Sequence, residues 1–163
     1  MAYLEEIIEN KNKIIKLLIN SEKIVETINN TTIETPDELV GQNIFRNLFI
    51  PDTQAEAKTY ICFDIYTNKV VDKLIKKADI HFWIFCHQSV SDTGLGYTRV
   101  DYIQSQIDRI MNGNYNFGID SVNLLGNGKF VPNATHNGVE LVYRVDDLNQ
   151  DRIGGFDTVK PRN

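Results

Sequence analysis

Two segments in which residues of different kinds alternate constrain the fold of this chain most. From Thr59 to Tyr66, one set of alternate positions holds Ile61, Phe63 and Ile65. Side chains of a strand point alternately to its two faces, so this segment predicts a strand with one apolar face. From Asp79 to His87 both sets carry bulk, with Ile80, Phe82, Ile84 and Cys86 on one and His81, Trp83, Phe85 and His87 on the other. The second segment therefore predicts a central strand that is covered on both faces.

Helical spacing appears in two other parts of the chain. The N-terminal segment has a stripe that predicts one amphipathic helix, formed by Leu4, Ile7, Ile8, Lys11, Ile14, Ile15 and Leu18. After Ser21 the pattern resumes at Ile24, Val25 and Ile28, either as a continuation or as a second short helix with a new cap. A later helix is expected to begin near Thr98 and Asp101, which resemble a capping box, and to stop at Asn112 and Gly113. Its apolar side holds Val100, Ile103, Ile107, Ile110 and Met111.

Two further strands are predicted, and together these elements define the fold class. The segment 119–125 alternates weakly, whereas 138–146 alternates clearly. The lysine-rich connector 68–77 is barely long enough for a crossover helix, although a short helical turn remains an alternative there. We expect an α+β fold, an α/β sandwich with a mainly antiparallel sheet of about four strands packed by the N-terminal helix and the capped helix. It forms one domain over 1–149, and 150–163 is an extended C-terminal tail.

An irregular insertion, residues 29–58, is long for a connection inside a compact domain. The run from Thr35 to Glu38 matches a capping box with proline at the first helical position, so one short helix is expected there. Several large apolar residues then precede Pro51, and they are the candidate subunit-interface residues: Phe45, Leu48, Phe49 and Ile50. Two interpretations stay open, since this segment either folds back over the sheet or forms an exposed patch that a neighbouring subunit covers.

Composition excludes several classes of protein. The formal net charge is −5 and no long Lys/Arg block occurs, which argues against tight binding to nucleic acid. The N-terminus lacks the pattern of a secretory signal, and no apolar run approaches about 18 residues, so neither export nor a membrane span is expected. We expect a protein kept in the cytosol, with Cys62 and Cys86 reduced.

Motifs for catalysis, cofactors and metals are weak throughout the chain. His81, Cys86 and His87 are the only cluster that resembles a metal site, yet Cys86 and His87 must point to opposite faces of a strand, and His136 is expected in a separate loop. The run Gly126–Lys129 resembles part of a phosphate loop and is interpreted as a turn. Asp147, Asn149 and Asp151 imitate calcium ligands without the required glycine. We expect no enzyme, no cofactor and no metal.

Three short strings within this order of elements carry a resemblance to a known family. They are the residues 51–61 (PDTQAEAKTYI), 97–103 (YTRVDYI) and 143–147 (YRVDD). With the order of helices and strands, they make the chain similar to small neck and tail-completion proteins of tailed bacteriophages, and within that group most similar to the tail terminator. The resemblance extends over most of the chain, from about residue 4 to about residue 149.

This resemblance implies a structural virion protein that forms a ring, typically a hexamer, on the end of the tail tube. Its partners would be further copies of itself, the tail tube protein and a head-tail connector or stopper protein, with DNA passing through the lumen without specific binding. It would be assembled in the bacterial host cytoplasm and end in the neck or tail of the virion. The alternatives are a head-tail connector or stopper ring, a small metal-dependent or enzymatic domain that uses His81 and His87, and an unrelated free-standing domain.

Overall fold

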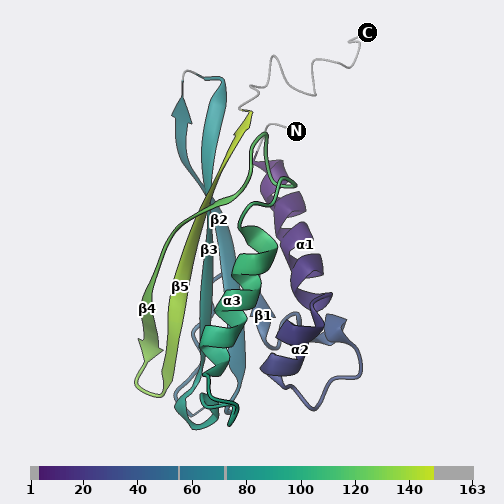
Figure 1. The fold of residues 1–163 in the computed structure, drawn as a ribbon, viewed down its shortest axis with the longest axis vertical. Coiled ribbons are helices and arrows are strands. Elements are labelled where there is room, and N and C mark those ends of the chain that lie inside the picture. The colour runs from purple at the N-terminus through teal and green to yellow at the C-terminus, as the bar shows by residue number, and fades with distance from the viewer. Residues whose placement is uncertain (1–3, 55, 72, 149–163) are drawn as a thin grey trace.

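The computed structural model describes residues 4–54, 56–71 and 73–148. Helices and strands are arranged as one helical layer on one sheet (Figure 1). The helical elements are α1 (Glu5–Ile19), α2 (Glu22–Ile28), the short 3-10 helices η1 (Pro36–Leu39) and η2 (Gln88–Val90), and α3 (Arg99–Met111). The strands are β1 (Ile44–Phe45), β2 (Thr59–Val71), β3 (Ile75–His87), β4 (Asn123–Asn133) and β5 (His136–Leu148).

The sheet has the strand order β1-β2-β3-β5-β4. Every neighbouring pair is antiparallel except β1 and β2, so the predicted α+β fold with a mainly antiparallel sheet is confirmed. The prediction of about four strands missed β1, because two residues are too few to show an alternating pattern. The strand β3 lies in the middle of the sheet, as the bulk on both of its faces predicts.

One face of the sheet and the three α-helices enclose the main core. The predicted apolar positions of β2, β3 and β5 lie in it beside Ile14, Ile24, Ile103 and Ile107 of the helices. Burial of so much apolar surface is the main contribution to the stability of such a layer. A polar group in this core, the hydroxyl of Tyr143, donates a hydrogen bond of 2.9 Å to Asp108 Oδ1, which offsets the cost of burying it.

The start of α2 and both ends of α3 follow the predicted signals, whereas Thr35 makes no side-chain cap at the start of η1. The Ser21 hydroxyl accepts a hydrogen bond from the backbone N–H of Ile24, so α2 is a separate helix with its own cap. Thr98 Oγ1 likewise accepts from the N–H of Asp101, at 3.1 Å. After α3, Gly113 has a φ of 81°, which glycine adopts at little cost and which ends the helix.

The connector 68–77 is not helical, so the predicted alternative of a helical turn there is wrong. Strands β2 and β3 continue through it as a hairpin, with Lys69 opposite Lys77 and Val71 opposite Ile75. Figure 1 shows this hairpin extending past the helical layer at the top of the view; we call residues 66–77 the arm. Residues 66–70 of the arm are all exposed, so this part of the hairpin gives no alternating pattern.

Three predictions for the C-terminal half are wrong. The strand expected at 119–125 is β4, which begins at Asn123, and the run Gly126–Lys129 belongs to this strand and is not a turn. As an exposed edge strand it needs no apolar alternation, so its sequence resembles a loop. His136 is the first residue of β5 and is buried, rather than part of a separate loop.

The stripe of α1 is buried only in part. Ile14, Ile15 and Leu18 are in the core, but Leu4 and Ile8 are exposed. The first turns of α1 lie against the charged base of the arm, where Glu6 forms a buried ion pair with Lys76, so an apolar side chain gains little there. The predicted single domain over 1–149 stays a prediction, and the tail 150–163 lies outside the described residues, as do the calcium candidates Asn149 and Asp151.

Candidate functional site

The second face of the sheet, opposite the helices, carries a separate aromatic cluster. Tyr60 and Cys62 of β2 and Trp83 and Phe85 of β3 are buried there. No helix of the described chain covers this face; instead, the last residue of β1 and the segment after it cross part of it. We call this segment, residues 45–51, the strap, and it contains all four candidate interface residues.

Ring stacking and hydrogen bonds hold the strap against the sheet. The rings of Phe45 and Phe49 stack with their centroids 4.5 Å apart, and the Phe49 ring lies 6.1 Å from that of Tyr60. The backbone of Phe49 also meets Cys62, whose Sγ accepts from the Phe49 N–H at 3.5 Å. At the far end Asn133 Nδ2 donates to the carbonyl oxygen of Pro51 at 3.0 Å, so the strap is tied at several points.

The outer surface of the strap remains apolar and accessible. Leu48 is 37% exposed, Phe49 41% and Ile50 51%, whereas Phe45 is half-buried beneath them. The segment thus folds back over the sheet and also presents an exposed apolar patch, so each of the two open interpretations describes one side of it. That a neighbouring subunit covers these residues stays a prediction.

The start of the strap is also connected to the helical layer. Lys11 of α1 donates to the carbonyl oxygen of Arg46 at 2.7 Å and forms an ion pair of 2.7 Å with Asp64 of β2. Burial disfavours the charged form of Asp64, but its hydrogen bonds with Lys11, Ile65 and Tyr66 outweigh this and lower its pKa. The carboxylate therefore stays charged and keeps Lys11 in place.

The thiol of Cys62 has a structural environment. Burial raises its pKa to about 11, so it stays protonated near neutral pH. A reactive cysteine needs a lowered pKa, because the thiolate is the nucleophile. Cys86 is buried on the opposite face of the sheet, in the main core, and burial raises its pKa too. Both thiols are free, in line with the expectation of reduced cysteines.

Beyond the strap, the second face continues as a row of rings toward the arm. His81 stacks on Trp83 with centroids 5.6 Å apart and meets the edge of Tyr66 at 5.3 Å. Its Nδ1 lies 3.0 Å from Glu140 Oε1. The sequence pattern predicted these side chains on one face of the sheet. Its prediction that both faces of β3 are covered is confirmed only in part, because the helices cover one face and the strap covers only part of the other.

The structure separates the residues of the weak metal cluster. His81 and Cys86 lie on opposite faces of the sheet, as do Cys86 and His87. His87 instead lies opposite His136 across the β3–β5 ladder, with ring centroids 5.3 Å apart. Over residues 4–54, 56–71 and 73–148, no group of three or more possible metal-binding side chains occurs. The pairing of His87 with His136 escaped sequence analysis because it depends on the strand register.

Folding stability should depend on pH through His136. Its Nδ1 lies 2.9 Å from Asn133 Oδ1, and its Nε2 is buried without a hydrogen-bond partner among the described residues. Burial, and the proximity of His87, lower its pKa from the usual 6.5. The unfolded chain therefore takes up a proton that the folded chain does not, and stability falls as the pH drops from 6.5 toward the folded pKa.

Urea unfolding between pH 7.5 and pH 5 measures this dependence. His136→Leu should flatten it, whereas the control His81→Gln should keep it, since His81 lies on another part of the sheet beside Glu140. An unchanged slope in His136→Leu would assign the effect to other groups.

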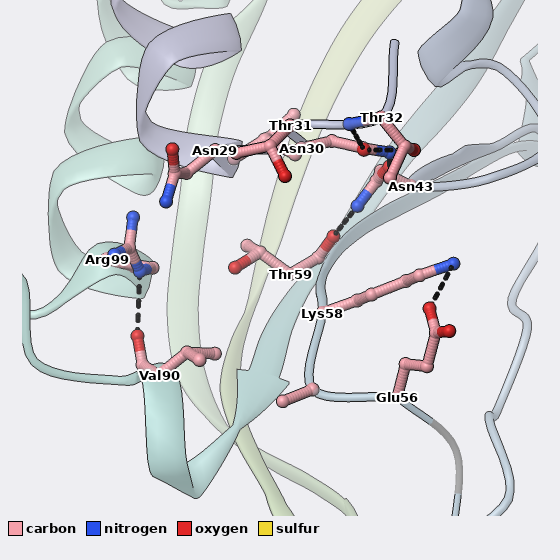
Figure 2. A pocket seen from close by; sticks show the side chains of 12 residues that line it. Asn29, Asn30, Thr31, Thr32, Asn43, Glu56, Lys58, Thr59, Val90 and Arg99 are labelled. Carbon is pink, nitrogen blue, oxygen red and sulfur yellow. Dashed lines mark hydrogen bonds and ion pairs between the residues drawn. The ribbon is translucent and has the colours of Figure 1, made fainter.

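A polar cavity of about 260 Å³ lies where α2, the start of β2 and α3 meet (Figure 2). Amides and hydroxyls from several elements line it. Asn43 Nδ2 donates to the carbonyl oxygen of Thr59 at 2.8 Å, and Asn30 Nδ2 donates to Asn43 Oδ1 at 2.7 Å. Arg99 donates to the carbonyl oxygens of Thr27 and Val90, each at 2.7 Å.

These contacts give the cavity a structural role. Its two cations are already engaged, since Arg99 donates to backbone carbonyls and Lys58 forms an ion pair of 3.5 Å with Glu56. Figure 2 marks the contact of Arg99 with Val90 and that of Lys58 with Glu56. The bonds of Arg99 tie the end of α2 to the loop that leads into α3. Arrays of this kind rigidify a junction between elements.

Within the described ranges, no helix has both the length and the apolar character needed to cross a bilayer.

Comparison with known proteins and protein families shows which family the chain belongs to. A comparison with curated proteins finds no match. The model of the YomW family, by contrast, matches residues 11–145, which include every helix and strand from the middle of α1 to near the end of β5. This family is one of Bacillus phage SPBc2-type proteins, which suggests a phage-derived protein. Since the match extends over most of the chain, the protein belongs to the YomW family.

Proposed function

We propose that this protein is a tail terminator, a virion subunit that forms a ring on the end of the phage tail tube and docks it to the head connector. The observation that carries the proposal is the strap, which leaves Leu48, Phe49 and Ile50 exposed while its backbone is tied to the sheet. Membership in a phage family and the resemblance of three sequence strings to neck proteins support the same assignment.

A tied strap suits a permanent interface. Apolar anchors contribute most of the binding free energy when they enter a dry pocket on the partner. Anchors that are ordered before binding lose less conformational entropy on association. Stacking on Phe45 and Tyr60 orders Phe49 in this way, so its exposed part is ready for a neighbouring subunit.

The remaining parts of the proposal follow from this role. The protein acts without catalysis, cofactor or metal, and its partners are copies of itself, the tail tube protein and the connector or stopper protein. Its net charge of −5 suits a ring through which DNA passes without specific binding. Its place is the neck of the virion, after assembly in the host cytoplasm.

Deletion of the gene from its phage or prophage, followed by negative-stain microscopy, tests the function. Tails of uncontrolled length beside unattached heads are the expected result. Tails of normal length beside heads that fail to join would mean that the protein is a connector or stopper and not a terminator. Unchanged infectious particles would refute both assignments.

Complementation of the deletion with strap variants tests the interface. We expect Phe49→Ala combined with Ile50→Ala to fail, because the ring loses its apolar anchors, while the purified variant loses only about 1–2 kcal/mol of unfolding free energy. Leu125→Ala is the matched control, since Leu125 is 51% exposed, as Ile50 is, but lies on β4. Normal particles from the strap variant would show that Phe49 and Ile50 are not interface residues.

A further inference from the structure

One buried hydroxyl in the wall of the polar cavity lacks a hydrogen bond. Thr59 is only 2% exposed, and its side chain lines the cavity between α2, β2 and α3. Its backbone carbonyl accepts from Asn43, but its hydroxyl has no partner among the described residues. Buried polar groups are nearly always hydrogen-bonded, because an unmade bond there is costly. The partner of this hydroxyl is therefore expected to enter through the cavity.

Two further side chains offer unused donors to the same space. Figure 2 shows the Asn29 amide and the Arg99 guanidinium on the side of the cavity toward which the Thr59 hydroxyl points. Arg99 uses Nε and Nη1 for the carbonyl oxygens of Val90 and Thr27, and its Nη2 donates to no described residue. Within the described ranges the Asn29 side chain makes no hydrogen bond either. Donors from the end of α2, the start of β2 and the start of α3 thus converge.

The charge of the lining is positive on balance. Lys58 and Glu56 form an ion pair and so cancel each other. Arg99 forms no ion pair in the part of the chain that the structure describes, since the carbonyl oxygens that it binds carry no net charge. A guanidinium with free N–H groups binds carboxylate and phosphate oxygens through charge-assisted hydrogen bonds. A ligand of this cavity should therefore carry acceptor oxygens and negative charge.

The volume of the cavity limits the size of its ligand. About 260 Å³ is less than the roughly 300–1,000 Å³ of pockets for drug-sized ligands. The lining is mainly polar, with Ile28 and Val90 among its few apolar side chains. These properties suit a small ion and leave little room for a nucleotide.

We propose that this cavity binds a small oxyanion, a carboxylate or a phosphate, between the Thr59 hydroxyl, the Asn29 amide and Nη2 of Arg99. The hydroxyl and the amide donate to oxygens of the anion, and the guanidinium supplies the opposite charge. The two carbonyl bonds of Arg99 hold the guanidinium in place before the anion arrives, which reduces the entropy lost on binding. This site goes beyond the proposed tail terminator and does not depend on ring formation.

Two-dimensional NMR of the full-length protein tests the site. Sodium acetate or sodium phosphate replaces sodium chloride at constant pH and ionic strength, so that screening of charges stays the same. The amide signals of residues 28–31, 58–59 and 99 should shift and saturate with at least one of the two anions. The anion with the lower dissociation constant then identifies the bound group as a carboxylate or a phosphate. Absence of a saturable shift with either anion would overturn the site.

Two substitutions connect binding to the named side chains. Thr59→Val replaces the hydroxyl with a methyl group of similar size and should weaken binding about fivefold, the effect of one lost hydrogen bond. Asn29→Asp places a negative charge beside the anion and should weaken binding at least tenfold. The backbone at Asn29 has a φ of 54°, a conformation that aspartate also tolerates.

Matched controls lie outside the cavity. Thr67→Val changes an exposed threonine of the same strand, and Asn127→Asp changes an exposed asparagine of β4. Both should bind the anion as the unmodified protein does. Unchanged affinity in Thr59→Val and Asn29→Asp, or an equal loss in the two controls, would overturn the assignment.

Urea unfolding in chloride distinguishes a ligand-binding hydroxyl from a structural one. The Thr59 hydroxyl has no partner in the described chain, so Thr59→Val should unfold at the same or a higher urea concentration when acetate and phosphate are absent. Lower stability of this variant together with unchanged affinity would mean that the hydroxyl serves the fold alone, and the proposed site would be wrong.

Discussion

Gly138→Ala is expected to destabilise the protein by about 3 kcal/mol or more, at the upper end of the cost of overpacking. Gly138 of β5 lies between Phe85 of β3 and Phe130 of β4, and the two rings meet with centroids 5.7 Å apart. A methyl group there would collide with the carbonyl oxygen of Ile84 and would lie 2.5 Å from Cβ of Phe85. Because backbone atoms are involved, rotation of a side chain cannot relieve the collision.

Gly128→Ala is the matched control for this substitution. Gly128 lies on β4, and a methyl group built on it has no neighbour within 4 Å. Urea unfolding followed by circular dichroism should therefore show a change within about 0.5 kcal/mol. Equal losses in the two variants would mean that β5 is not held between Phe85 and Phe130 as described.

Phe82→Ala is expected to cost about 3–5 kcal/mol, the usual range for deleting a buried aromatic ring. Phe82 is at the centre of β3, fully buried, and its ring contacts those of Phe63 and Tyr143 at centroid distances of 6.0 Å and 5.9 Å. Its removal leaves a cavity between the sheet and the helices that neighbouring side chains fill only in part.

Phe49→Ala provides the comparison for a phenylalanine of the strap. Phe49 is partly exposed, so its loss should cost about 1 kcal/mol, chiefly from the stacking on Phe45 and Tyr60. Thermal unfolding of both variants tests the difference. A similar loss from each would place Phe49 in the stabilising core and would count against its role as an interface residue.

Segments that lie against the helical layer were predictable from their sequence. The alternation at Ile61, Phe63 and Ile65 and the cap at Thr98 act locally, so they require no knowledge of the rest of the fold. Such signals appear where one side of an element is buried and the other is not, which is the case for α3 and for the inner parts of β2, β3 and β5.

Elements outside this layer were mostly missed or misassigned. The arm and β4 are exposed on both faces over much of their length, so no selection for apolar alternation marks them as strands. The strand β1 is short, and it exists because Ile44 pairs with Ile61 of a distant segment. Backbone pairing of this kind depends on neighbours in space, which a local pattern does not show.

For the candidate site, too, the sequence predicted one part and the tertiary structure decided the rest. Phe45, Leu48, Phe49 and Ile50 were identified from composition alone, because large apolar residues in an irregular acidic segment need a partner of some kind. Their division into a buried side and an exposed side and the register that brings His87 to His136 follow only from the tertiary structure.

The sequence by itself determined the class of this protein: a small acidic α+β chain with a mainly antiparallel sheet, an amphipathic N-terminal helix, a second, capped helix and no recognisable catalytic motif. Only the tertiary structure decided which apolar groups stay outside the core. The helices cover one face of the sheet, the strap covers part of the other, and the arm projects beyond both. Exposure is the outcome of packing among distant segments, and for that reason local patterns could not establish which surfaces remain for assembly.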